Sequence, residues 1–147
     1  MSDRIARKIE LKAPIQRVWQ ALTDHREFGQ WFRVRLDGPF ALGGESTGQM
    51  TYPGYEHAKW HATVTRMEEP HLFAFTWPHP EDMAGDPAGA PTTLVEFRLE
   101  ETSEGTRLTV VESGFEALPE DRRATAMRSN EGGWTEQMQN IRAHVEG

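Results

Sequence analysis

The sequence predicts an α+β fold in which a curved antiparallel sheet packs against one long C-terminal helix. Between residues 34 and 111, short segments with strand-like alternation are separated by glycine- and proline-containing turns. Residues 119–145 then return to helical periodicity. Consecutive strands joined by short turns pair antiparallel, and the helix can bury its apolar face against their sheet. The 147 residues have room for one such domain, which we expect to span residues 1–147.

The N-terminal part of the chain predicts one strand followed by two short helices. Residues 7–11 alternate charged and aliphatic side chains, as a half-buried strand does. Pro14 suits a first helical turn, and the apolar residues from Ile15 to Leu22 recur at helical spacing. A second helix over residues 25–32 places three aromatic residues on one side: Phe28, Trp31 and Phe32.

The strands that form the rest of the sheet are expected at residues 34–36, 45–51, 59–68, 72–77, 93–101 and 106–113. One connection between them differs from the others. Residues 78–91 are rich in proline and have no periodicity, which is typical of an irregular hairpin tip or of a lid over a binding site.

The C-terminal segment predicts a long amphipathic helix. Pro119 and the two acidic residues after it suit a first helical turn. An apolar stripe follows at spacings of three, four and seven: Ala124, Met127, Trp134, Met138, Ile141 and Val145. Gly132 and Gly133 interrupt this helix at a cost of about 2 kcal/mol relative to alanines. We therefore expect a bend there, or a backbone that approaches the sheet or a ligand too closely for a side chain.

The composition excludes several classes of function. Sixteen Lys and Arg against 23 Asp and Glu give a net charge of −7, which disfavours nucleic acid as a partner. The absence of cysteine excludes disulfides, thiol nucleophiles and cysteine-ligated metals, and it suits a cytoplasmic location. No stretch approaches the ~18 apolar residues of a membrane span, and the N-terminus lacks the apolar core of a signal peptide.

Four segments carry a resemblance to a known family: residues 13–23 (APIQRVWQALT), 64–77, 105–115 (GTRLTVVESGF) and 130–134 (NEGGW). Their order and spacing resemble the START-like superfamily, also called SRPBCC, and within it the bacterial branch similar to activators of the heat-shock-protein-90 ATPase. The resemblance covers nearly the whole chain and implies a helix-grip fold. In many relatives the cavity between sheet and helix accepts lipids, hormones or other apolar molecules, whereas other relatives are cyclase-type proteins or co-chaperone domains.

Large aromatic side chains on the inward faces of the strands and helices are the candidates to line such a cavity. Strand alternation and helical phase select them from the five tryptophans and seven phenylalanines. The expected ligand-binding residues are Trp31, Trp60, Phe75, Trp77, Phe97, Trp134 and Met138. The alternative is that these side chains simply fill the core.

Glu112 is the one acidic residue that the pattern places on an apolar face, which it shares with Leu108 and Val110. We expect it to be a polar anchor for the ligand, where burial favours the neutral acid and permits general acid or base work. The alternatives are that Glu112 pairs with Arg66 or Arg128, or that a bulge turns it to solvent.

Signals for metal binding or catalysis are weak. His57 and His61 are four residues apart, but in a strand pattern this spacing does not bring their side chains together. No nucleophile elbow, phosphate-binding loop or dinucleotide fingerprint occurs, so we assign no catalytic residue, metal or cofactor.

The sequence favours a monomeric or homodimeric protein that binds a small hydrophobic or amphipathic ligand. The alternatives are a cofactor-independent cyclase- or hydrolase-like enzyme, or a co-chaperone-like interaction module.

Overall fold

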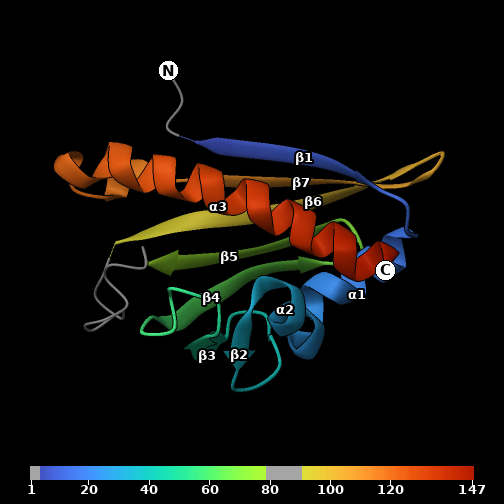
Figure 1. Ribbon diagram of the computed structural model, residues 1–147, viewed down its shortest axis with the longest axis horizontal. Coiled ribbons are helices and arrows are strands. Elements are labelled where there is room, and N and C mark those ends of the chain that lie inside the picture. The colour runs from blue at the N-terminus through green and yellow to red at the C-terminus, as the bar shows by residue number, and fades with distance from the viewer. Residues whose placement is uncertain (1–3, 79–90) are drawn as a thin grey trace.

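Figure 1 shows the computed structural model, in which a curved sheet lies behind one long helix; it describes residues 4–78 and 91–147. The elements in chain order are β1 (Ile5–Leu11), α1 (Ile15–Thr23), α2 (His25–Phe32), β2 (Val34–Leu36), β3 (Glu45–Met50), β4 (Lys59–Glu68), β5 (Leu72–Pro78), β6 (Thr92–Thr102), β7 (Gly105–Ser113), the 3-10 turn η2 (Phe115–Ala117) and α3 (Glu120–Glu146). The predicted α+β class and its helix-grip arrangement are confirmed. Residues 79–90, which hold most of the predicted proline-rich connection, lie outside the described residues.

The described strands form one antiparallel sheet in the order β1-β7-β6-β5-β4-β3-β2. Strands β3 to β7 are neighbours in sequence order, as short connections dictate, and β1 joins beside β7. The register sets Val95 of β6 opposite both Phe75 of β5 and Glu112 of β7. The inward face predicted for Val95, Phe97 and Leu99 is confirmed, since all three are buried.

The two short helices owe their sharp boundary to Asp24. Its carboxylate accepts hydrogen bonds from the backbone N–H groups of Arg26 and Glu27, which caps the start of α2. Arg33, in a left-handed conformation, ends the same helix. Trp31 donates its indole N–H to the carbonyl oxygen of Ala21 at 2.8 Å, which holds α1 and α2 together.

Aromatic rings fill the centre of the bowl formed by the sheet. Trp60, Phe73, Phe75 and Phe97 from the strands are fully buried, together with Phe28 from α2. Their rings meet edge-to-face or stacked, with the stacked pair of Phe73 and Phe97 at a centroid distance of 6.2 Å. The centre of the fold is therefore packed, and free space can remain only toward its rim.

The apolar stripe predicted along α3 is confirmed except at its start: Trp134, Met138 and Ile141 are buried, and Met127 and Val145 pack partly buried against the core. Ala124 is exposed and Ala126 is buried in its place; the next buried residue along the helix is Trp134. Between Ala126 and Trp134, Met127 packs partly buried against the core, and the helix then borders a pocket at residues 129–133. The helix is held at its sides by polar contacts, such as the 3.1 Å ion pair of Arg7 with Glu131. Among the described residues, no helix is long and apolar enough to cross a membrane.

Candidate ligand-binding pocket

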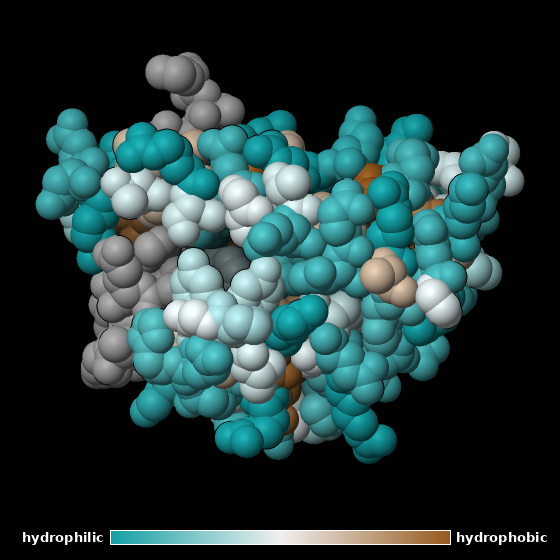
Figure 2. Space-filling model, viewed as in Figure 1, coloured by the Kyte–Doolittle hydropathy of each residue, from teal (hydrophilic) through white to brown (hydrophobic). Residues whose placement is uncertain are grey.

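A pocket of about 510 Å³ lies between the middle of α3, the inner face of β4 and β5, and residues 51–58, which connect β3 to β4. The molecular surface is hollowed on this face, below α3 (Figure 2). The volume is within the range of small-molecule sites. The residues that line the pocket are Phe32, Met50, Tyr52, Tyr55, Ala58, Trp60, Trp77, Ser129, Asn130, Gly132, Gly133, Trp134, Glu136 and Gln137.

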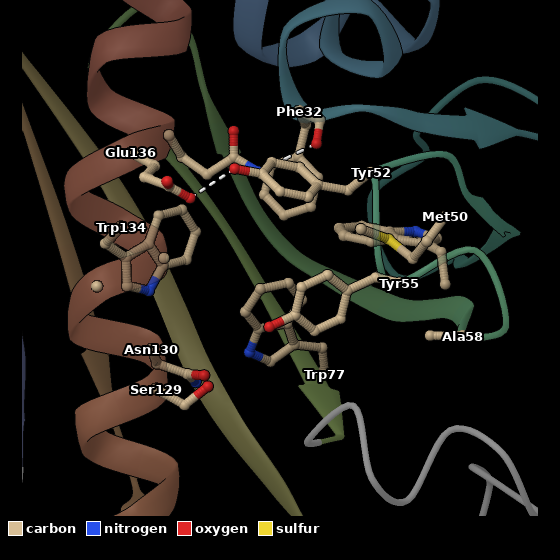
Figure 3. A pocket seen from close by; sticks show the side chains of 14 residues that line it. Phe32, Met50, Tyr52, Tyr55, Ala58, Trp77, Ser129, Asn130, Trp134 and Glu136 are labelled. Atoms are coloured by element: carbon tan, nitrogen blue, oxygen red, sulfur yellow. Dashed lines mark hydrogen bonds between the residues drawn. The ribbon is translucent and has the colours of Figure 1, made fainter.

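Three tryptophans and a phenylalanine form the inner wall. Trp77 of β5 and Trp134 of α3 stack, with centroids 5.7 Å apart and planes inclined by 30°. Trp60 of β4 meets Trp77 edge-to-face at 5.6 Å, and Phe32 lies 6.2 Å from Trp134. Figure 3 shows Trp134 projecting from α3 toward Trp77. Phe32, Trp60 and Trp134 are almost completely buried in this wall, and Trp77 is the ring that keeps partly exposed surface.

Two tyrosines form the opposite wall. Tyr52 and Tyr55 lie on the connection after β3, with their rings edge-to-face at 5.9 Å. The Tyr52 hydroxyl donates a 2.5 Å hydrogen bond to Glu136 Oε2 on α3, drawn as a dashed line in Figure 3. This bond raises the pKa of Tyr52, and partial burial and the carboxylate charge act in the same direction. The contact joins the connection to the helix at the edge of the pocket.

Glu112 of β7 lies behind the inner wall and has no exposed surface. Its carboxylate accepts hydrogen bonds from the indole N–H groups of Trp77 and Trp134, both at 2.9 Å. It also accepts from Asn130 Nδ2 at 2.9 Å and from Thr93 Oγ1 at 2.5 Å. The predicted inward direction of Glu112 is confirmed, but its described partners are four neutral donors and neither Arg66 nor Arg128.

The glycine pair of α3 borders open space. A Cβ atom added at Gly132 or Gly133 would meet no atom within 4 Å apart from the helix's own nearby backbone. Of the three alternatives for this pair, which were a bend, close approach to the sheet and close approach to a ligand, close approach to the sheet is therefore wrong. Both glycines line the pocket, and the space that a Cβ would enter at each of them is open.

Three of the eight predicted site residues line this pocket: Trp60, Trp77 and Trp134. Glu112 is one layer behind, where it orients two of those tryptophans. The other four are buried side chains of the core and are not among the lining residues: Trp31, Phe75, Phe97 and Met138. The alternative that the aromatics fill the core is thus correct for the centre of the bowl, because the rings there are large enough to close it.

Sequence reasoning did not assign the remaining lining residues to the site. Asn130 and Gln137 could have been found from helical phase, since they are four residues before and three after Trp134. Tyr52 and Tyr55 flank a Pro-Gly turn, where aromatic residues are a signal for a site because turns are usually polar. Nothing local in the sequence indicates that Glu136 meets Tyr52, which is 84 residues away.

The lining of the pocket suits the binding of a small organic molecule. Within residues 4–78 and 91–147, no three His, Cys, Asp or Glu side chains group as metal ligands. The pocket lining combines aromatic rings with the amides of Asn130 and Gln137 and the hydroxyl of Ser129. Such a lining can bury a flat apolar group and hydrogen-bond a polar substituent.

Comparison with known proteins gives a family and a fold. The model of the family described as activator of Hsp90 ATPase homolog 1-like protein matches residues 12–146. The structure of DynU16, from the dynemicin biosynthetic locus, is 23% identical with a TM-score of 0.77; the alignment covers 99% of this chain and 48% of DynU16. This chain thus spans about half the length of DynU16.

Two further solved structures match over most of both chains. A protein from Arthrobacter aurescens is 22% identical with a TM-score of 0.80, over 99% of this chain and 87% of the other. Protein BH1534 from Bacillus halodurans is 25% identical with a TM-score of 0.72, over 99% of both chains. No protein with a curated description matches this chain.

Proposed function

Because this chain belongs to the activator of Hsp90 ATPase homolog 1-like family, within the START-like superfamily, we propose that it binds a small hydrophobic or amphipathic molecule in the pocket under α3. The observation that carries the proposal is the pocket of about 510 Å³, which is lined by aromatic rings and left open by two helical glycines. A planar apolar group would lie against Trp77 and the two tyrosines, with its polar end toward the amides of α3.

Gly132 and Gly133 support a ligand-binding function. They make α3 less stable than alanines would, and no neighbouring protein atom requires the absence of a side chain at either position. Glycine in a helix interior is about 1 kcal/mol less favourable than alanine. At Gly132 and Gly133 the surrounding structure would admit a methyl group, since nothing lies within 4 Å of the added Cβ. A ligand that occupies this space gives a reason for the missing side chains.

The described surface supports a pocket function over a docking function. The large hydrophobic residues that stand out as exposed in the described part of the chain are Leu42 and Tyr55. Tyr55 belongs to the pocket lining. Leu42 is therefore the remaining one of these two exposed side chains, and it stands by itself. Within residues 4–78 and 91–147, these exposed side chains do not form a contiguous apolar patch of the kind that marks many protein-interaction sites.

A second candidate is an enzyme that uses the same pocket. Tyr52 and Glu136 are a hydrogen-bonded pair of titratable side chains in the lining, and such a pair can shuttle a proton to a bound substrate. DynU16, the similar protein of a biosynthetic locus, is consistent with small-molecule chemistry on this fold. A co-purified molecule that is recovered chemically altered after incubation with the protein favours the enzyme, and one that is recovered intact favours the binding protein.

The binding function is tested with N-phenyl-1-naphthylamine, a neutral apolar probe that fluoresces when it leaves water. We expect saturable binding to the wild-type protein and at least tenfold weaker binding to Gly133→Phe, whose ring would fill the pocket. Ala143→Phe is the matched control, because it adds the same ring to an exposed position of α3 outside the lining. Absence of binding to the wild type, or equal binding to Gly133→Phe, would show that the pocket is not a ligand site. If Gly133→Phe fails to fold, Gly132→Leu replaces it.

A further inference from the structure

We propose that the pocket prefers ligands that carry a permanent or protonated cationic amine beside an apolar group, over neutral and anionic analogues. This inference rests on the proposed binding function and names the chemical class of the ligand. Three observations lead to it: the ring faces in the lining, the carboxylate behind two of those rings, and the sign of the charges around the pocket.

The aromatic rings of the lining can attract a cation through their faces. Six aromatic residues line the pocket: Phe32, Tyr52, Tyr55, Trp60, Trp77 and Trp134. A cation is attracted to an aromatic face within about 6 Å of the ring centroid, and tryptophan is the strongest partner. The structure already contains one such contact, since the guanidinium carbon of Arg33 lies 5.8 Å from the centroid of Tyr52. Of the lining rings, those of Tyr52, Tyr55 and Trp77 keep exposed surface and offer the same type of contact to a ligand.

The carboxylate of Glu112 makes two of these faces more attractive to a cation. The indoles of Trp77 and Trp134 each donate their N–H to this carboxylate at 2.9 Å. A donor bound to an anion is polarised, so electron density shifts from the N–H bond into the ring. Among residues 4–78 and 91–147, the four side chains that donate to Glu112 are neutral, so none of these four offsets its charge. Its negative field thus reaches the pocket through the two indoles.

The charges of the lining have the same sign. Among the described residues that line the pocket, Glu136 is the charged one, and none is lysine, arginine or histidine. The whole chain has a net charge of −7. The carboxylates of Glu136 and Glu112 lie in or behind the lining, and the guanidinium of Arg33 beside Tyr52 offsets part of their charge. The remaining negative charge attracts cations and repels anions. A neutral ligand gains the apolar contact but not this electrostatic contribution.

The preference is tested with three naphthalene probes that differ in one tetrahedral end group. They are trimethyl(naphthalen-2-ylmethyl)ammonium, methyl naphthalen-2-ylmethyl sulfone and naphthalen-2-ylmethanesulfonate, which are cationic, neutral and anionic at every accessible pH. Isothermal titration calorimetry on the whole chain should show the ammonium binding about tenfold more tightly than the sulfone, and the sulfonate most weakly. A sulfone or sulfonate that binds as tightly as the ammonium overturns the charge preference and leaves the binding function intact. If none of the three binds and N-phenyl-1-naphthylamine does not bind either, both proposals fail.

A matched pair of variants locates the effect. Glu136→Gln removes the charge at the pocket edge and keeps an acceptor for Tyr52, so we expect about threefold weaker ammonium binding and unchanged sulfone binding. Glu101→Gln makes the same change in net charge at the exposed end of β6, outside the lining, and should leave both affinities unchanged. An equal loss of ammonium affinity in both variants would mean that overall charge, and not this pocket, attracts the cation.

Discussion

The indole rings of Trp77, on β5, and Trp134, on α3, stack 5.7 Å apart while both donate to the same buried carboxylate. The sheet and the long helix are thus joined through a polar cluster centred on Glu112 of β7, as well as by apolar packing. Hydrogen bonds fix the direction of each indole, so the cluster sets the shape of the pocket wall.

Replacement of Glu112 by glutamine should destabilise the protein by about 1–3 kcal/mol, because a buried polar group would lose its partner. The new amide N–H₂ would face the donors that now bind the carboxylate. The measurement is the free energy of unfolding in urea, with exposed Glu101→Gln as control. Equal stability of Glu112→Gln and wild type would show that the cluster does not hold the wall in place.

Tyr52 should lose its proton at a lower pH when Glu136 is replaced by alanine. In the folded protein the hydrogen bond to Glu136 raises the pKa of Tyr52 above its ordinary value of about 10. The stabilisation from this bond is therefore complete below that ordinary value and is lost as the pH rises through the higher folded pKa. The ultraviolet absorbance of tyrosinate measures the titration, and Tyr52→Phe identifies the step among the two tyrosines. An unchanged titration in Glu136→Ala would contradict the contact.

Glu27 should contribute stability that disappears in acid. Burial by itself raises the pKa of Glu27, but hydrogen bonds from His144 of α3 and Arg17 of α1 outweigh burial and lower the pKa. A lowered folded pKa means that the stabilisation is present above the ordinary value of about 4.3 and is lost as the pH falls through the folded value. Glu27→Gln should thus be less stable than wild type at neutral pH, with the gap closing in acid. Urea unfolding at a series of pH values tests this, and parallel pH profiles for the two proteins would refute it.

The strands were predictable because burial on one face leaves a period of two in the sequence. The same phase that buries Leu108 and Val110 places Glu112 inside, so even this unusual carboxylate could be predicted from local pattern alone. The ends of the strands shift by one or two residues, as at β1, which begins at Ile5 instead of the predicted residue 7. Local alternation indicates which side chains of a strand face inward. It does not indicate at which residue the hydrogen bonding between two neighbouring strands ends.

The position of the pocket was not predictable from the sequence, because it depends on which large aromatic side chains pack into the core between the sheet and the helices. Phe75 and Phe97 have the same alternation signal as Trp77, yet they are fully buried in the core while Trp77 is partly exposed. The phase of the helix was also ambiguous near its start, where Ala126 instead of Ala124 is buried. His144 contacts Glu27 at 2.9 Å, a tertiary contact across 117 residues that has no local signal in the sequence.

The glycines of the helices give the sharpest prediction, because α2 and α3 use glycine for opposite reasons. A Cβ atom at Gly29 of α2 would lie 2.4 Å from the carbonyl oxygen of Val34, so Gly29→Ala must displace backbone and should destabilise the protein. A Cβ at Gly132 or Gly133 meets nothing, so alanine at each position should stabilise α3 by about 1 kcal/mol. Urea unfolding should therefore shift in opposite directions for Gly29→Ala and for the double variant Gly132→Ala/Gly133→Ala.

The double variant should gain this stability at the expense of binding, since its two methyl groups enter the pocket volume. We expect weaker binding of N-phenyl-1-naphthylamine to a protein that is more resistant to urea, a combination that general damage to the fold cannot produce. Increased stability with unchanged binding would mean that a ligand does not need the space beside the helix, and the bare backbone would then have no part in recognition. Reduced stability would show instead that Gly132 and Gly133 serve the geometry of α3 itself.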